Sequence, residues 1–275
     1  MPVCMQTLAS PGAARKVGIM VSGQLVRGAQ CSIRNAIVLA LIALPSVAVA
    51  QSGNGYLFKK PSGSFVMRAG YEPSRVSGEG FDVLRRETTL GDDSFNSFNL
   101  GIDFNYFLSR YVDLTFTLDV SSRASTSEYR DWEENGQPIV HETQLDRFGL
   151  GAGFRYNLLS RGRQISSLAY IPAKTVPYVG ATAGVMWYEF TQSGDFVEVV
   201  NDSTGNIFSD ELASRHHGVM GQVFGGIERR LTPRWSLVGE ARFTQSNSKF
   251  TKDYIGLGNL QLSGLALNLG ASVRF

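Results

Sequence analysis

Histidine, serine and carboxylate side chains are the first residues to examine for catalysis, because together they can form a nucleophilic triad. His141 does not belong to a local trio of these residue types, whereas His216 follows Glu211 and Ser214 in the one trio of this kind. His217 could add a second imidazole for a metal ion, but neighbouring residues of a strand point to opposite faces. We therefore interpret these side chains as the polar ends of strands beside loops, and we predict no catalytic, cofactor-binding or metal site.

The composition limits the elements that could position these residues. Of the 275 residues, 43% are hydrophobic, 18% are charged and 30 are glycine. Such a chain is too hydrophobic for intrinsic disorder. It contains no unbroken apolar run of 18 residues or more, which excludes a helical transporter or receptor.

The first fifty residues have the order of a secretory signal peptide. Arg27 and Arg34 precede the apolar run of residues 36–44, which ends at Pro45 and leads to small residues at 48–50. A basic region, a short apolar region and a small-residue site are typical of an exported precursor. We predict a signal peptide over residues 1–50, cleaved after position 50, with Met20 as an alternative start of translation.

Removal of this segment changes the chemistry of the chain. It takes away four of the 26 basic side chains and none of the 24 acidic ones, which leaves 22 against 24. Cys4 and Cys31 are also lost, so the exported chain could form no disulfide and no cysteine metal site. A mildly acidic chain gives no support for a basic nucleic-acid-binding surface, and we expect no nucleic-acid partner.

After residue 50, apolar side chains alternate with polar or very small ones in eight runs. The runs are residues 64–72, 99–106, 112–121, 147–156, 179–187, 219–230, 235–244 and 264–275. In the third run, Val, Leu, Phe, Leu and Val alternate with Asp, Thr, Thr, Asp and Ser. Period-two alternation indicates strands with two chemically different faces.

The connections between these runs alternate in length. Long polar connections are expected at 73–95, 123–142, 193–212 and 249–260, and tight ones at 108–111 and 231–234. Asn135 and Gly136 predict a hairpin tip within the second long connection. The middle connection, about 158–175, could be a short helix or an unstructured loop. The connections are therefore short at one end of the predicted strands and long at the other.

Alternation alone cannot distinguish a soluble barrel with an apolar interior from a membrane barrel with an apolar exterior. The polar face carries six arginines and six acids, interspersed with glycines: Arg68, Glu72, Asp103, Asp113, Asp119, Arg147, Arg155, Glu228, Arg230, Glu240, Arg242 and Arg274. In a narrow eight-stranded lumen, small residues leave room for long ones. Enclosed charges need partners of opposite sign. We predict that these twelve side chains form an ionic network in the lumen, although scattered surface charge is the alternative.

Aromatic side chains near the strand ends favour the membrane interpretation. Tyr106, Tyr111, Tyr156, Tyr178, Trp235 and Phe275 are expected near the tight turns, and Tyr71, Phe98 and Trp187 near the long connections. Two such sets are typical of the interfacial girdles of a membrane barrel. Each alternating stretch also has about the 9 to 11 residues that a tilted strand needs to cross a bilayer.

Residues from about 63 to 275 resemble the eight-stranded outer-membrane β-barrels of Gram-negative bacteria, the OmpA, OmpX and OmpW group. Residues 177–184 resemble a strand common in that group. The last strand resembles the signal by which the outer-membrane assembly machinery recognises such chains, through Leu269, Ala271, Val273 and Phe275. The resemblance implies an all-β fold, an antiparallel up-and-down transmembrane β-barrel of eight strands in the outer membrane.

This resemblance sets the functional expectations. Residues 51–62 would be a periplasmic segment, both barrel termini would face the periplasm, and the long loops would lie outside. We expect a monomer in contact with outer-membrane lipid, with a structural or surface-interaction role and a loop surface available to an extracellular ligand. A narrow channel for small or hydrophobic solutes is the alternative. A lipid-modifying enzyme is less favoured, because the trio around His216 lacks the deacylase spacing of a histidine two residues before a serine.

Overall fold

The computed structural model describes residues 55–134, 136–201 and 204–275. The predicted signal peptide and its cysteines lie outside the described residues, as does Asn135 of the expected hairpin tip. Within the described part, no helix has the length and apolar character needed to cross a membrane.

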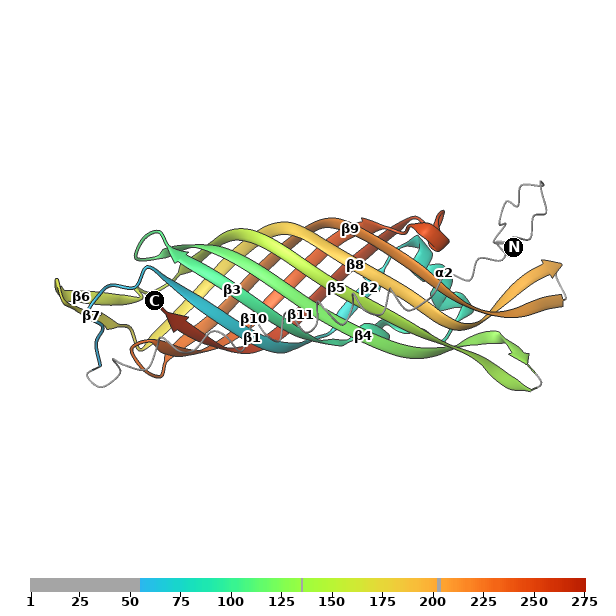
Figure 1. Ribbon diagram of the computed structural model, residues 1–275, viewed down its shortest axis with the longest axis horizontal. Coiled ribbons are helices and arrows are strands. Elements are labelled where there is room, and N and C mark those ends of the chain that lie inside the picture. Colours follow the sequence, from blue (N-terminus) through green and yellow to red (C-terminus); the bar gives the residue numbers. More distant parts are fainter. Residues whose placement is uncertain (1–54, 135, 202–203) are drawn as a thin grey trace, which may run out of the picture. The chain divides into compact units, whose positions relative to one another are not determined.

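Eight antiparallel strands close into a barrel (Figure 1). They are β1 (Gly63–Glu72), β3 (Ser97–Phe107), β4 (Val112–Glu134), β5 (Gln137–Asn157), β8 (Thr175–Asn201), β9 (Thr204–Arg230), β10 (Trp235–Lys249) and β11 (Asn259–Arg274). Each of these strands pairs with the next along the chain, and β1 pairs with β11 to close the ring. The predicted all-β, antiparallel up-and-down barrel of eight strands is confirmed.

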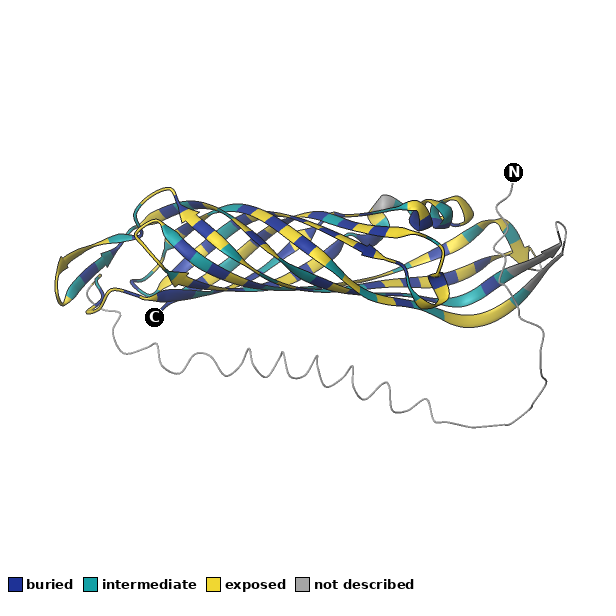
Figure 2. Cartoon of the chain, turned by 90° about the horizontal axis from the view of Figure 1, so that it is seen from above, coloured by how far each residue is buried: buried dark blue, intermediate teal, exposed yellow. Residues whose placement is uncertain are grey.

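Strand register keeps the two faces of the sheet separate around the ring. Leu118 lies opposite Leu150, which in turn lies opposite Val185, so one outward row is apolar across three strands. The next row places Asp119 opposite Gly149 on the inward side. Figure 2 shows the resulting checkerboard of buried and exposed residues along the barrel. A slip of one residue would move every side chain to the wrong face.

Four strands are much longer than a membrane requires. β4 and β5 have 23 and 21 residues, and β8 and β9 have 27 each. The expectation that 123–142 and 193–212 are polar loops is therefore wrong, because most of these residues continue the strands beyond the barrel (Figure 1). The sequence did not indicate this continuation, because outside the bilayer neither face of a strand needs an apolar row.

The two long hairpins separate near their outer ends. The last pair that joins β5 to β8 is His141 with Gly194, and beyond it β4–β5 and β8–β9 form two separate arms. Gly194 has φ of +140°, and a Cβ there would lie within 3.0 Å of His141 and of the Val140 carbonyl oxygen. Glycine is therefore needed where the arms diverge. Gly136, with φ of +75°, lies in the turn of the β4–β5 arm, where a hairpin tip was predicted.

The end of the barrel that carries the arms also carries a cap, and we call it the loop end. Its short elements are β2 (Ser74–Ser77), α2 (Glu79–Glu87), η1 (Asp92–Phe95) and η2 (Lys252–Tyr254). β2 pairs with β11. In α2, Phe81 and Leu84 are buried, acids occupy the first turn and arginines the last, an order that suits the helix dipole. The connections at 73–95 and 249–260 are thus folded segments rather than solvated loops.

The opposite end carries the tight connections at 108–111 and 231–234, and we call it the turn end. The uncertain connection at 158–175 contains a β-hairpin there, β6 (Gly162–Ser166) with β7 (Ala169–Pro172), so it is neither a helix nor an unstructured loop. Leu57 exchanges two backbone hydrogen bonds of 2.8 Å with Tyr170, which ties the segment before β1 to this hairpin.

Candidate functional site

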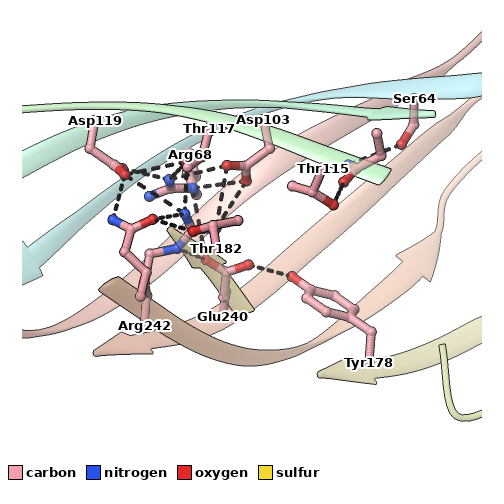
Figure 3. Close-up of polar contacts among 12 residues, drawn as sticks. Ser64, Arg68, Asp103, Thr115, Thr117, Asp119, Tyr178, Thr182, Glu240 and Arg242 are labelled. Atoms are coloured by element: carbon pink, nitrogen blue, oxygen red, sulfur yellow. Dashed lines mark hydrogen bonds and ion pairs between the residues drawn. The ribbon is translucent and has the colours of Figure 1, made fainter. Parts of the chain in front are cut away.

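The centre of the lumen holds a layer of five charged residues from four strands (Figure 3). Arg68 Nε lies 3.0 Å from Asp103 Oδ2, and a second nitrogen of the same guanidinium contacts Asp119. Arg242 Nε lies 2.9 Å from Glu240 Oε1, and its Nη2 lies 3.3 Å from Asp103 Oδ1. Asp103 therefore bridges two arginines. Both arginines lie deep inside the barrel, where charges are stable only when they are paired.

Neutral side chains complete this layer. Thr117 accepts a hydrogen bond of 2.8 Å from Arg242 Nη1, and the Gln222 amide nitrogen donates to Asp119 at 2.8 Å. The Tyr178 hydroxyl donates to Glu240 Oε2 at 2.9 Å (Figure 3). The sequence does not indicate these partners, because a threonine or glutamine on a polar face carries no signal for a particular contact.

The assignment of Tyr178 to the outer aromatic girdle is wrong. Its neighbour Val179 is 47% exposed on the outside, so Tyr178 must point inward, and it is 2% exposed. Its ring lies 3.7 Å below the guanidinium carbon of Arg155, which adds a cation–π contact. A tyrosine suits this place because its hydroxyl reaches Glu240 while its ring covers an arginine.

A second charged layer lies towards the turn end. Arg155 Nη2 lies 2.7 Å from Glu228 Oε2, and Arg274 contacts the other oxygen of Glu228. Asp113 lies 3.8 Å from Arg155 and also contacts Arg161. All of these side chains are buried. This layer closes the lumen between the central charged layer and the turn end.

Two arginines differ from the prediction. Arg161 belongs to the lumen network although it was not predicted to, and the assignment of Arg230 to the network is wrong. Arg161 precedes β6 in an irregular connection, where no alternation marks an inward residue. Arg230 is only half-buried at the rim, and its Nη1 donates to the Pro172 carbonyl oxygen at 2.6 Å. It forms no ion pair with another described residue. Because Arg161 takes its place, the network still holds six arginines against six acids.

The third charged layer lies towards the loop end. Arg147 Nη1 lies 2.9 Å from Glu72 Oε1, and its Nη2 donates to Ser74 at 2.9 Å and to Ser97 at 3.0 Å. Eleven of the twelve predicted network residues therefore take part in ion pairs within the lumen. Glycines make room for them, since a Cβ on Gly101 would overlap the Arg68 guanidinium.

Above the third layer, the lumen becomes apolar. The cap and the inward side chains of the strands form one cluster: Val76, Phe81, Leu84, Leu90, Phe95, Leu145, Met186, Tyr188, Phe190, Met220, Phe250, Tyr254, Leu260 and Leu262. The predicted network of charged and polar side chains ends at the third layer, because above it the inner face packs against an apolar cap. Burial raises the pKa of Tyr254, whose neutral hydroxyl donates to Gln192 at 2.6 Å. The loop end is thus closed by an ordinary hydrophobic core.

A small cavity lies among the charged side chains inside the described barrel. Between the central and third layers, a cavity of about 20 Å³ is lined by Asp119, Arg147, Met186 and Gln222 among others. That volume accommodates roughly one water molecule. The three charged layers and the apolar cluster therefore fill the lumen rather than line a pore.

The outer surface has the opposite chemistry. Large apolar side chains are exposed there on every one of the eight barrel strands, among them Met67, Leu100, Phe116, Leu150, Val179, Val219, Leu237 and Leu267. Eight of the nine predicted girdle aromatics are also exposed: Tyr71, Phe98, Tyr106, Tyr111, Tyr156, Trp187, Trp235 and Phe275. An apolar surface of this extent is stable against lipid and not against water.

The four residues of the predicted assembly signal share this outer face. Leu269 is 70% exposed and Phe275 is 56% exposed, and Ala271 and Val273 lie between them on the same side of β11. The Phe275 carbonyl oxygen accepts a hydrogen bond from the Ser62 amide at 2.9 Å, so the strand is paired to its end.

The structure does not assemble the trio around His216. Ser214 is fully buried, and its hydroxyl contacts Tyr188 at 3.0 Å and accepts a hydrogen bond from the Thr251 amide at 2.9 Å. Glu211 lies exposed on the arm. Ser214 therefore anchors the cap to β9.

A different histidine does contact a serine. His141 Nε2 lies 2.7 Å from Ser127 Oγ, and both residues are buried between the arms. Its Nδ1 has no hydrogen-bond partner among the described residues, whereas a catalytic histidine needs a group that orients it. Burial lowers the pKa of His141, which keeps it neutral at pH 7. The sequence could not identify this pair, because Ser127 and His141 belong to opposite strands of one hairpin.

No family model and no curated protein sequence matches this chain. Similar solved structures include Neisserial surface protein A (NspA), at 17% identity and a TM-score of 0.40, which covers 78% of this chain and 99% of that one. The attachment invasion locus protein Ail of Yersinia pestis has 14% identity and a TM-score of 0.41 over 78% and 99%. The outer membrane protease OmpT of Escherichia coli has 11% identity and a TM-score of 0.34 over 84% and 100%.

The fold is that of an outer-membrane β-barrel. A closed ring of eight strands leaves no unpaired edge, an apolar belt surrounds it, and charged side chains are enclosed within it. Closed barrels satisfy every backbone hydrogen bond internally and can therefore cross a bilayer. In this barrel, side chains fill the lumen, and the sheet continues past the apolar belt as two arms.

Proposed function

We propose that this protein is a closed barrel anchored in the bacterial outer membrane, and that its two arms bind a partner outside the cell. The single observation that carries the proposal is the contrast between a filled lumen and the long strands that continue beyond the apolar belt. Strands of 27 residues in β8 and β9 far exceed the length needed for the membrane. A barrel that served only to fill the bilayer would not need them.

The charge of the arms indicates the chemistry of the partner. Exposed or half-exposed acids on β4–β5 and β8–β9 are Glu128, Asp131, Glu133, Glu134, Glu142, Asp195, Asp210 and Glu211. Two nearby arginines already have other partners: Arg215 pairs with Glu189, and Arg130 donates a hydrogen bond to the Thr88 carbonyl oxygen. We infer a partner surface that carries positive charge.

The orientation follows from the same arrangement. We place the loop end outside the cell and the turn end, with both barrel termini, in the periplasm. Short turns on the periplasmic side and long extensions on the outer side are typical of such barrels. The C-terminal strand would then meet the assembly machinery from the periplasm.

A channel is the weaker alternative. Three charged layers and an apolar cap stand between the two ends, and an ionic network of this kind resists opening. In planar bilayers, the purified barrel should give no steady ionic conductance. A stable current would favour the channel over the surface-interaction role.

The surface-interaction role can be tested by trimming the arms at paired residues. Residues 129–139 between Glu128 and Val140, and residues 195–209 between Gly194 and Asp210, can each be replaced by an Asn-Gly turn. Bacteria that display the intact barrel should adhere to polylysine-coated surfaces more than to heparin-coated ones. The trimmed barrels should lose that preference while they keep the heat-dependent gel mobility of a folded barrel. Unchanged adhesion would reject the proposed role of the arms.

A further inference from the structure

Charge is distributed unevenly along the barrel. Outside the lumen, the turn end carries eight cations: Lys59, Lys60, Arg110, Arg163, Lys174, Arg229, Arg230 and Arg234. The acids in the described part of this end are Asp113 and Glu228, and both are buried and paired with lumen arginines. The turn end therefore carries a large positive charge, in contrast with the acidic arms at the other end.

Part of this charge surrounds a cavity. The cavity has a volume of about 630 Å³ and lies between the β6–β7 hairpin and the rim of the barrel. Its cationic lining residues are Lys60, Arg110, Arg161, Arg163, Lys174 and Arg230, and no acid lines it. Arg161 is neutralised by Asp113, whereas the other five form no ion pair with a described residue.

The walls of this cavity are fixed by backbone contacts. Arg230 is oriented by its 2.6 Å hydrogen bond to the Pro172 carbonyl oxygen. Tyr170, on the hairpin wall, is held by the two hydrogen bonds that it exchanges with Leu57. Five like charges that line one concave site repel one another, and an anion that enters would relieve this repulsion.

We propose that this cavity binds a phosphate group. Guanidinium groups donate paired hydrogen bonds to phosphate oxygens, and lysines add point charges, so several cations suit a phosphate better than a single carboxylate. The phosphate could belong to a phospholipid headgroup or to a soluble phosphate compound. Exposed leucines lie within two positions in the sequence of residues that line the cavity, and they offer contacts for acyl chains that favour the headgroup: Leu108, Leu158, Leu159 and Leu231.

Calorimetric titration of the full-length folded barrel in a zwitterionic detergent would test the proposal at low salt, where charge contacts are strongest. The probes are short-chain phosphatidylglycerol, phosphatidylcholine of the same chain length, pyrophosphate and citrate. Binding of phosphatidylglycerol alone would identify a headgroup site, and comparable binding of pyrophosphate would identify a site for soluble phosphate. Binding of citrate as tightly as either phosphate probe, or no binding of either, would overturn the assignment.

Substitution of the cavity cations tests whether the phosphate binds in this cavity. Lys60→Gln, Arg110→Gln, Arg163→Gln and Lys174→Gln together should weaken phosphate binding at least about tenfold, because several charge-assisted contacts are lost. The matched control removes four exposed cations at the loop end: Arg75→Gln, Arg123→Gln, Lys249→Gln and Lys252→Gln. An equal loss in the control would show a general charge effect and would refute a defined site. All four substituted cavity residues are exposed, so the variant should fold.

Discussion

Arg242 is only 1% exposed in the lumen, and it pairs with Asp103, Asp119 and Glu240 in the central layer. Arg242→Leu would leave Asp103 and Glu240 enclosed with less compensation. We expect a loss of about 3 to 5 kcal/mol in the free energy of unfolding, measured by urea titration in lipid vesicles. Arg215→Leu, which breaks an exposed pair with Glu189, should cost no more than about 1 kcal/mol. Equal effects of the two changes would contradict an enclosed network.

His141 should make the stability of the arms depend on pH. Its pKa lies below the ordinary 6.5 because burial disfavours the charged ring. A group with a lowered pKa stabilises the folded state above its unfolded pKa, and this stability is lost as the pH falls through the folded pKa. When the pH is lowered from about 7.5 to about 5, the urea midpoint of unfolding should therefore decrease more in the wild type than in His141→Phe.

His217 offers a matched control for this titration, because it is an exposed histidine on β9. His217→Phe should keep the pH response of the wild type. A response that is the same in all three proteins would show that His141 does not titrate on unfolding.

At the scale of the strand, small residues decide whether the lumen can hold its long side chains. A Cβ at Gly101 on β3 would overlap the Arg68 guanidinium, which is held by Asp103 and Asp119. Gly101→Ala should cost about 1 to 3 kcal/mol in the free energy of unfolding. Gly221→Ala on β9 is the control, since no atom lies within 4 Å of the added Cβ. The control should be neutral or slightly stabilising, and the opposite order would reverse the assignment of faces.

The connections show where sequence patterns stop being informative. Period two holds wherever one face meets lipid and the other meets the lumen, so the eight spanning stretches could be predicted closely. In the arms, both faces meet water or each other, and the backbone pairing of β8 with β9 continues without an alternating pattern. The β6–β7 hairpin likewise depends on pairing with Leu57, which its own sequence does not indicate.

At the scale of the whole molecule, the fluorescence of three tryptophans can show which part of the protein lies in the bilayer. Trp187 and Trp235 are 42% and 38% exposed on the outer surface, near the two edges of the belt, and Trp132 lies far out on the β4–β5 arm. In single-tryptophan variants of the barrel in vesicles, lipid-attached quenchers should reduce the fluorescence of Trp187 and Trp235. Trp132 should respond only to a water-soluble quencher. Insensitivity of both girdle tryptophans to lipid quenchers would exclude a membrane-spanning belt.

The sequence alone determined that the chain forms strands, how many cross the membrane and, with the exceptions of Tyr178 and Arg230, which charged and aromatic residues face inward. Lipid and lumen impose different chemistry on alternate positions. Only the tertiary structure decided which charges meet. Arg242 and Thr117 are separated by 125 positions, and Arg161 takes the place expected of Arg230. Ring closure brings such residues together, and no local spacing encodes it. The tertiary structure also decided the arms and the cap. The arms depend on backbone pairing between distant residues, and the cap residues meet the inward side chains of the strands only in the folded barrel.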